Sequence, residues 1–182
     1  EFLQMRCVAD PAVTEEQYLA VAQKKTAGLI SSACEVGAVY GNGSTAQATA
    51  LAEYGTRIGI AFQIADDLLD YLGDEGVTGK KTGNDFIEGK MTLPLIHALG
   101  HVDAGGRATL IDCIENGREQ STAYHQVREL MHGAKSFAYC RIRAEQEIEK
   151  ALAALSGFAQ DQHRQSQIIL RSLAEYILNR ER

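Results

Sequence analysis

The sequence lacks three features that would place it in whole classes of protein. It has only 2 prolines among 182 residues, which excludes a polyproline or low-complexity chain. No apolar run approaches the roughly 20 residues that a membrane span requires. Its 18 Lys and Arg residues are outnumbered by 24 Asp and Glu residues, giving a formal charge of −6. We therefore expect no binding of nucleic acid through a broad basic surface, although a small polyanion needs only a few cations or a metal ion.

The cysteines also lack a recognisable pattern. Four of them stand far apart, and no CxxC pair is present: Cys7, Cys34, Cys113 and Cys140. This spacing argues against a zinc cage and, at this chain length, against a disulfide framework. We expect buried thiols in a reducing compartment, and hence a cytoplasmic protein.

What the sequence does have is helical periodicity along most of its length. Hydrophobic residues make up 45% of the chain and recur mostly at steps of three and four. No segment alternates with a period of two, so we predict an all-α fold of long helices packed as a bundle. We also predict a single domain over residues 1–182, because no linker or internal repeat divides the chain. The predicted helices are 15–38, 45–72, 92–99, 107–116, 120–132, 134–155 and 162–180.

Two capping boxes mark the beginnings of the first long helices. Thr14 with Gln17, and Ser44 with Gln47, have the spacing at which side chains satisfy free backbone N–H groups. Pro94 falls in the first turn of the short helix 92–99, where a missing N–H costs little.

Three carboxylates share one face near the end of the predicted helix 45–72. Asp66 and Asp70 are four residues apart, and Asp67 and Asp70 are three apart, which is destabilising for like charges. No Lys or Arg lies between positions 58 and 79 to offset them. A solvated acidic face is one interpretation, but negative charge near a helix C-terminus is unfavourable. A divalent cation would offset the repulsion, and carboxylate oxygens suit Mg²⁺.

The segment 73–91 is rich in glycine and contains Lys80, Lys81 and Lys90. A long connection without regular structure is usually functional or disordered. Lysines on such a lid could reach a phosphate held by Mg²⁺ at the aspartates. The alternative is a mobile surface loop whose lysines only keep the chain soluble.

Small residues occur where two predicted helices could approach each other closely. Lys25 and Thr26 precede the small residues Ala27 and Gly28 within the helix 15–38. In the helix 45–72, Gly55 and Gly59 have no side chain and leave space on the helix surface. Lys25, beside the hydroxyl of Thr26 and these small residues, could bind a phosphate between two helices, although a solvated lysine is the simpler interpretation. The two glycines leave room for a close neighbour or for a chain-like ligand.

Several of these segments, taken in order, resemble one protein family. They are Lys25-Thr26, the stretch GIAFQIADDLLDYLGD, the pattern GK-x-x-G-x-D over Gly79 to Asp85, and EGKMTLPLIHAL. Together they resemble the trans-isoprenyl (polyprenyl) diphosphate synthases, and within them the bacterial long-chain enzymes of the octaprenyl and solanesyl type. DDLLD is similar to the second aspartate-rich motif of that family. The resemblance implies an isoprenoid-synthase type of helical bundle.

The resemblance also implies an activity and a set of site residues. Members are Mg²⁺-dependent prenyltransferases that condense isopentenyl diphosphate with an allylic diphosphate into an all-trans polyprenyl diphosphate, here expected to serve quinone side chains. Metal binding is implied for Asp66, Asp67 and Asp70. Catalytic or substrate-binding roles are implied for Lys25, Thr26, Gln63, Lys80 and Lys90. Members are usually homodimers, and the lipophilic product implies at most transient membrane contact.

The sequence departs from the family pattern in what it lacks. It has no second DDxxD motif and no Gly-Lys-Arg cluster, and it opens with EFLQM, which resembles the interior of a family helix. We therefore expect the chain to be the C-terminal half of such an enzyme and to be inactive alone. A minor departure is Lys81, where the family often has Pro.

Two other functions stay open at this point. One is a non-catalytic or regulatory subunit that retains half of the isoprenoid synthase fold. The other is a helical Mg²⁺-dependent phosphohydrolase or a terpene cyclase, for which the GK-x-x-G-x-D and GK-x-TLP patterns would not be expected.

Overall fold

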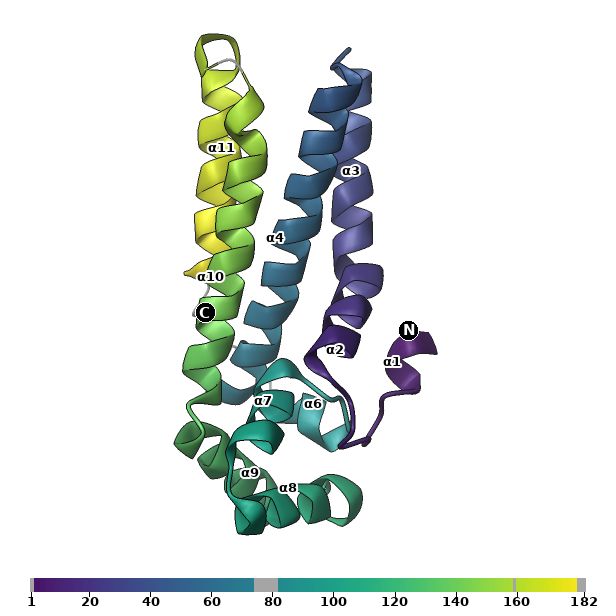
Figure 1. The fold of residues 1–182 in the computed structure, drawn as a ribbon, viewed down its shortest axis with the longest axis vertical. Helices are drawn as coiled ribbons and strands as arrows, with labels where there is room; N and C mark the ends of the chain where they lie inside the picture. Colours follow the sequence, from purple (N-terminus) through teal and green to yellow (C-terminus); the bar gives the residue numbers. More distant parts are fainter. Residues whose placement is uncertain (1, 74–81, 159, 180–182) are drawn as a thin grey trace. The chain divides into compact units, whose positions relative to one another are not determined.

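The computed structural model describes residues 2–73, 82–158 and 160–179, and this part of the chain is helical without any strand (Figure 1). The predicted all-α fold is confirmed. None of the helices in these ranges combines the length and the apolarity of a membrane span. The elements in chain order are α1 (Phe2–Met5), α2 (Glu15–Ala22), η1 (Gln23–Ala27), α3 (Gly28–Tyr40), α4 (Thr45–Leu72), α6 (Asn84–Ile87), α7 (Leu93–His101), α8 (Ala104–Asn116), α9 (Ser121–Gly133), α10 (Ser136–Ala154), η2 (Leu155–Gly157) and α11 (Gln160–Leu178).

Local capping interactions explain where the main helices begin. The Thr14 backbone N–H donates to Gln17 Oε1 at 2.8 Å, and the Gln17 N–H donates to Thr14 Oγ1 at 3.3 Å. Ser44 and Gln47 make the same pair of hydrogen bonds at 2.8 and 3.3 Å. Both predicted capping boxes are therefore confirmed. Helix α8 begins before its predicted start because the carboxylate of Asp103 accepts from the N–H of Gly106 at 2.7 Å.

The first predicted long helix is continuous but not uniform. Between α2 and α3 lies η1, a π-helical turn in which the N–H of Gly28 donates to the carbonyl of Gln23, five residues earlier. Single π-turns of this kind are frequent at functional sites. Lys25 and Thr26 both lie on this turn.

The chain forms two compact units, which are described separately. The first contains residues 2–21, 66–73 and 82–141, and the second contains residues 22–65, 142–158 and 160–179. Helices α4 and α10 each contribute residues to both units. The expectation of one domain over residues 1–182 stays a prediction.

In the second unit, α4 packs closely on η1 and α3 (Figure 1). A Cβ at Gly59 would overlap the Cα of Ala27, and a Cβ at Gly55 would lie 2.7 Å from the Cα of Ser31. Ser31 Oγ also donates to the carbonyl of Ala52 at 2.8 Å. The glycines therefore accommodate a neighbouring helix, so Gly59 does not face a chain-like ligand.

The core of the first unit lies between the end of α4 and helices α6 to α9. Its fully buried side chains include Tyr71, Phe86, Leu95, Ile114 and Met131. The hydroxyl of Tyr71 lies 3.0 Å from Thr92 Oγ1, which satisfies both polar groups inside this core. This packing fixes the segments that carry Asp70 and Lys90.

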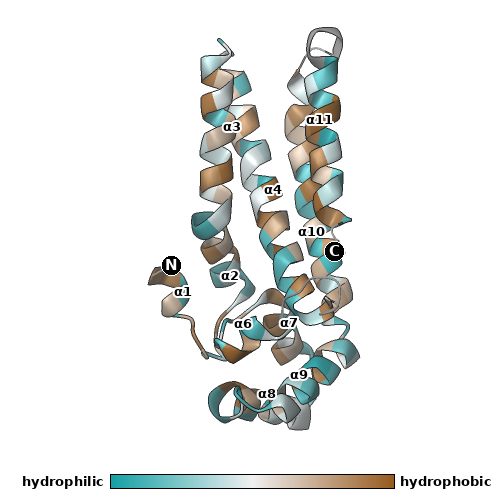
Figure 2. Cartoon of the chain, turned by 180° about the vertical axis from the view of Figure 1, so that it is seen from behind, coloured by the Kyte–Doolittle hydropathy of each residue, from teal (hydrophilic) through white to brown (hydrophobic). Residues whose placement is uncertain are grey.

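Helix α3 exposes a row of apolar side chains in the second unit. Leu29 is 78% exposed and Tyr40 is 87% exposed, and Val36 and Val39 are exposed as well. Figure 2 shows brown, hydrophobic residues along this helix. An exposed apolar face of this kind is typical of a surface that another protein segment covers.

Candidate functional site

The three aspartates of α4, all in the first unit, have different environments. Asp66 is exposed, Asp67 is only 4% exposed, and Asp70 is half-buried. In the ranges that the structure covers, no three His, Cys, Asp or Glu side chains are grouped as a metal cage would need. Mg²⁺ does not require such a cage, because it is usually held by one or two carboxylates together with substrate phosphates and water.

Asp67 is held by a tyrosine that the sequence analysis did not select. The hydroxyl of Tyr18, on α2, donates to Asp67 Oδ2 at 2.7 Å across 49 residues of sequence. Burial and the negative charge of Asp67 raise the pKa of the Tyr18 phenol well above its usual range. The phenol therefore stays protonated and donates to the carboxylate, and hydrogen bonds to a charged group are the stronger ones.

Asp70 is tied to the segment that leads to α6. The backbone N–H of Asp85 donates to Asp70 Oδ2 at 3.1 Å. Burial, and next the negative charge of Asp85, raise the pKa of Asp70 to about 6, although backbone hydrogen bonds from Asp85 and Asn84 oppose the shift. A nearby cation would favour the ionised carboxylate.

Lys90 lies in an acidic setting next to the same aspartate. Its ammonium contacts Asp85 Oδ1 at 2.8 Å and Glu88 Oε2 at 2.7 Å. Burial lowers the pKa of Lys90, but the hydrogen bonds to Asp85 and Glu88 outweigh that effect and raise it. Asp85 therefore links the carboxylate of Asp70 to the cation of Lys90. It belongs to the quoted GK-x-x-G-x-D pattern, but the spacing alone gave it no role.

A glycine turn positions Lys90. Gly89 has φ +73°, and a Cβ there would overlap the guanidinium of Arg118. The carbonyl of Gly89 also accepts from the N–H of Ala9 at 2.8 Å. A residue with a side chain would be strained at this φ and would displace Arg118.

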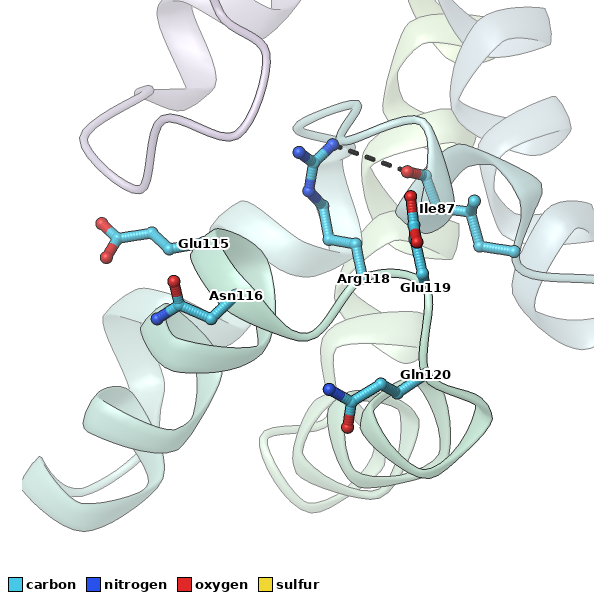
Figure 3. A pocket seen from close by; sticks show the side chains of 6 residues that line it. All are labelled: Ile87, Glu115, Asn116, Arg118, Glu119 and Gln120. Carbon is cyan, nitrogen blue, oxygen red and sulfur yellow. Dashed lines mark hydrogen bonds between the residues drawn. The ribbon is translucent and has the colours of Figure 1, made fainter.

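Beside this turn is a polar pocket of about 330 Å³. Figure 3 shows Arg118 reaching toward Ile87, whose carbonyl accepts from Arg118 Nη1 at 3.5 Å. The residues that line the pocket are Ile87, Glu115, Asn116, Arg118, Glu119 and Gln120. None of the residues that the sequence selected lines it.

In the second unit, Thr26 and Gln63 are in direct contact. Thr26 Oγ1 donates to Gln63 Oε1 at 2.8 Å. Lys25 is exposed on the π-turn. Gln63 is on α4, three residues before Asp66 and four before Asp67, which is the spacing of one helix face. Lys80 and Lys81 lie outside the described residues, so the predicted role of Lys80 is untested.

Comparison with known proteins identifies the family. Residues 1–131, more than half of the chain, match the sequence pattern described as Polyprenyl synthetase. The chain belongs to the polyprenyl synthetase family. It is 37% identical to an octaprenyl diphosphate synthase from Haemophilus influenzae over 174 residues, which cover 96% of this chain and 53% of that protein.

Solved structures of polyprenyl synthases share the fold. A decaprenyl diphosphate synthase from Rhodobacter capsulatus superposes with a TM-score of 0.88 at 39% identity, covering 100% of this chain and 55% of that one. A polyprenyl synthase from Caulobacter crescentus, complexed with calcium and isoprenyl diphosphate, gives a TM-score of 0.90 at 34% identity, covering 100% and 54%. The chain thus spans about half the length of these polyprenyl synthases, as expected from the missing motifs.

Proposed function

We propose that this chain supplies one part of a Mg²⁺-dependent trans-polyprenyl diphosphate synthase. The proposed enzyme condenses isopentenyl diphosphate with an allylic diphosphate into an all-trans polyprenyl diphosphate for quinone side chains. The observation that carries the proposal is the linked set Asp70, Asp85 and Lys90, in which a carboxylate and a cation lie next to each other. The related structure with calcium and isoprenyl diphosphate supports the same combination of a divalent ion and a diphosphate.

The donor set on α4 fits Mg²⁺. Asp66 is exposed to an incoming ion, and Asp67 and Asp70 follow on the same helix at a spacing that brings their carboxylates near it. Asp66, Asp67 and Asp70 would hold the ion, with substrate phosphate oxygens completing its coordination. Bound there, Mg²⁺ supplies Lewis-acid stabilisation of the leaving diphosphate.

In this proposal the lysines, together with Thr26 and Gln63, bind and position the substrates. Lys25 and Lys80 bind the allylic diphosphate, and Lys90 adds positive charge near it. Thr26 and Gln63, already joined by a hydrogen bond, line the cavity near the reacting carbons. Breaking of the allylic C–O bond leaves an allylic carbocation. The double bond of isopentenyl diphosphate attacks this carbocation, and a proton is then lost to the departing diphosphate.

The proposal extends to assembly and location. A homodimer would give the exposed apolar face of α3 a partner surface. The enzyme is expected to be cytoplasmic, with at most transient membrane contact for its lipophilic product. The alternative is a non-catalytic or regulatory subunit, and the intact set of Asp66, Asp70, Lys25 and Lys90 disfavours it because a scaffold has no need of them.

Substitution of the exposed aspartate tests the metal role. In the complete protein, Asp66→Ala is expected to lower prenyl transfer at least about 100-fold, because a catalytic metal contributes several kcal/mol to transition-state stabilisation. Turnover with isopentenyl diphosphate, an allylic primer and Mg²⁺ is the measurement, and far-UV circular dichroism is expected to show unchanged helicity. Glu129→Ala, which removes an exposed carboxylate on α9, serves as the control and should retain activity. Unchanged turnover in Asp66→Ala would rule out Asp66 as a metal ligand.

A further inference from the structure

Tyr18 is a buried side chain whose only polar atom points at one of the proposed metal ligands. Tyr18 is 6% exposed, and its hydroxyl donates to Asp67 Oδ2 at 2.7 Å. Asp67 is itself 4% exposed. A carboxylate at this depth is costly unless it is hydrogen-bonded, so the phenol compensates a charge that the fold has buried.

The hydrogen bond fixes the carboxylate as well as stabilising it. A carboxylate has about four lone-pair sites and can rotate about its last torsion, whereas a phenol donates a single directed hydrogen bond. Holding Oδ2 in one place therefore sets the plane in which the carboxylate presents its oxygens. Partners behind a metal ligand commonly orient it in this way.

Tyr18 is in turn held firmly from the start of α2. The capping box of Thr14 and Gln17 fixes the first turn of the helix, and the N–H of Tyr18 donates to the carbonyl of Thr14 at 3.0 Å. A second tie comes from α10, where the hydroxyl of Tyr139 donates to Glu15 Oε2 at 2.5 Å. These hydrogen bonds fix the first turn of α2, which carries Tyr18.

We propose that Tyr18 is a positioning residue that orients the carboxylate of Asp67 for the divalent cation of the diphosphate site. The inference rests on the proposed function, because it assumes that Asp67 acts on that cation. It adds a residue on α2 to a metal site otherwise built from α4. Tyr18 acts only through Asp67 and touches neither substrate nor metal.

The test is the Tyr18→Phe variant of the complete protein, which keeps the buried ring and removes only the hydroxyl. The Mg²⁺ concentration for half-maximal prenyl transfer is expected to rise about 10-fold, within the range seen when partners behind a metal ligand are removed. The turnover number at saturating Mg²⁺ is expected to stay within about 3-fold of the wild type, since the reacting groups are untouched. Binding of Mn²⁺ in the presence of inorganic pyrophosphate, followed by electron paramagnetic resonance, should weaken in parallel.

Two other variants separate orientation of Asp67 from general stability. Tyr139→Phe removes the other tie to α2 without touching Asp67 and should leave the Mg²⁺ requirement unchanged. Tyr18→His, which retains a ring N–H donor, should fall between the wild type and Tyr18→Phe.

Three results would overturn the inference. One is a Tyr18→Phe variant with the wild-type Mg²⁺ requirement, whatever its stability. A second is a Tyr139→Phe variant whose Mg²⁺ requirement rises as much as that of Tyr18→Phe, because the effect would then come from the placement of α2. The third concerns Asp67→Asn: if this variant leaves the metal dependence unchanged, then the proposed role of Asp67 fails, and the inference fails with it. A change in Asp67→Asn without one in Tyr18→Phe would overturn the inference alone.

Discussion

At the scale of single residues, the buried carboxylates are distinguished by what compensates their charge. Asp67 receives a hydrogen bond from the neutral phenol of Tyr18, whereas Glu147, in the second unit, is compensated by cations. Arg57 Nη1 lies 3.0 Å from Glu147 Oε2, Lys150 Nζ lies 2.7 Å from Oε1, and the Glu147 side chain is 3% exposed. A buried carboxylate that pairs with two cations, as Glu147 does, suits a structural role.

The ion pairs of Glu147 predict a pH-dependent stability. Burial raises the pKa of Glu147, but hydrogen bonds from Lys150 and Arg57 outweigh it, so the folded pKa lies below the usual value of 4.5. Such a group stabilises the fold above the unfolded pKa, and this contribution is lost as the pH falls through the folded pKa. Glu147→Gln should therefore lower the free energy of unfolding at pH 7 by about 1 kcal/mol. A larger loss is not expected, because Arg57 and Lys150 are partly exposed and water screens their charges. The cost should shrink in acid.

Urea unfolding of the complete protein at pH 7 and at pH 3 provides the comparison. Glu145→Gln, which alters an exposed carboxylate on the same helix, is the matched control and should change the free energy of unfolding by less than about 0.5 kcal/mol. A deficit in Glu147→Gln that is equal at both pH values would show that its charge is not what stabilises this region.

At the scale of helices, the close approach of α4 to η1 is set by glycine. Gly59 has no space for a Cβ because the backbone of Ala27 fills it. Gly59→Ala should destabilise the complete protein by about 1–3 kcal/mol, since the overlap must be relieved by moving the helix backbone. This direction is opposite to the usual gain of about 1 kcal/mol for Gly→Ala inside a helix.

Gly100 provides the comparison for this substitution. A Cβ at Gly100, on α7, meets no atom within 4 Å, so Gly100→Ala should be neutral or stabilising by up to about 1 kcal/mol. Thermal unfolding of the two variants is the measurement. Equal effects at Gly59 and Gly100 would contradict the close helix contact.

These elements also show what the sequence could predict. The capping residues Thr14 and Ser44 act within four residues, so the beginnings of α2 and α4 were correctly predicted, and the aspartates share a helix face simply because of their spacing. The π-turn and the hydrogen bond from Tyr18 to Asp67 were not predicted. The first depends on how η1 packs, and the second joins residues 49 positions apart, for which local patterns carry no signal.

At the scale of the whole molecule, the chain spans about half the length of the polyprenyl synthases that it matches. The chain covers 53% of the Haemophilus influenzae octaprenyl diphosphate synthase and 54% of the Caulobacter crescentus structure. The residues predicted to bind the metal, Asp66, Asp67 and Asp70, would supply one set of ligands to an ion that also binds substrate phosphates. We therefore expect the 182-residue chain alone to be inactive and the complete protein to be required for turnover.

Product analysis of the complete protein decides whether this is a prenyltransferase. The protein is incubated with isopentenyl diphosphate, an allylic diphosphate primer and Mg²⁺, and the extracted products are separated by chain length. We predict all-trans polyprenyl diphosphates whose formation stops when Mg²⁺ is chelated and resumes when it is restored. A folded, complete protein that transfers no prenyl group in the presence of Mg²⁺ would contradict the proposed function and would favour the non-catalytic subunit.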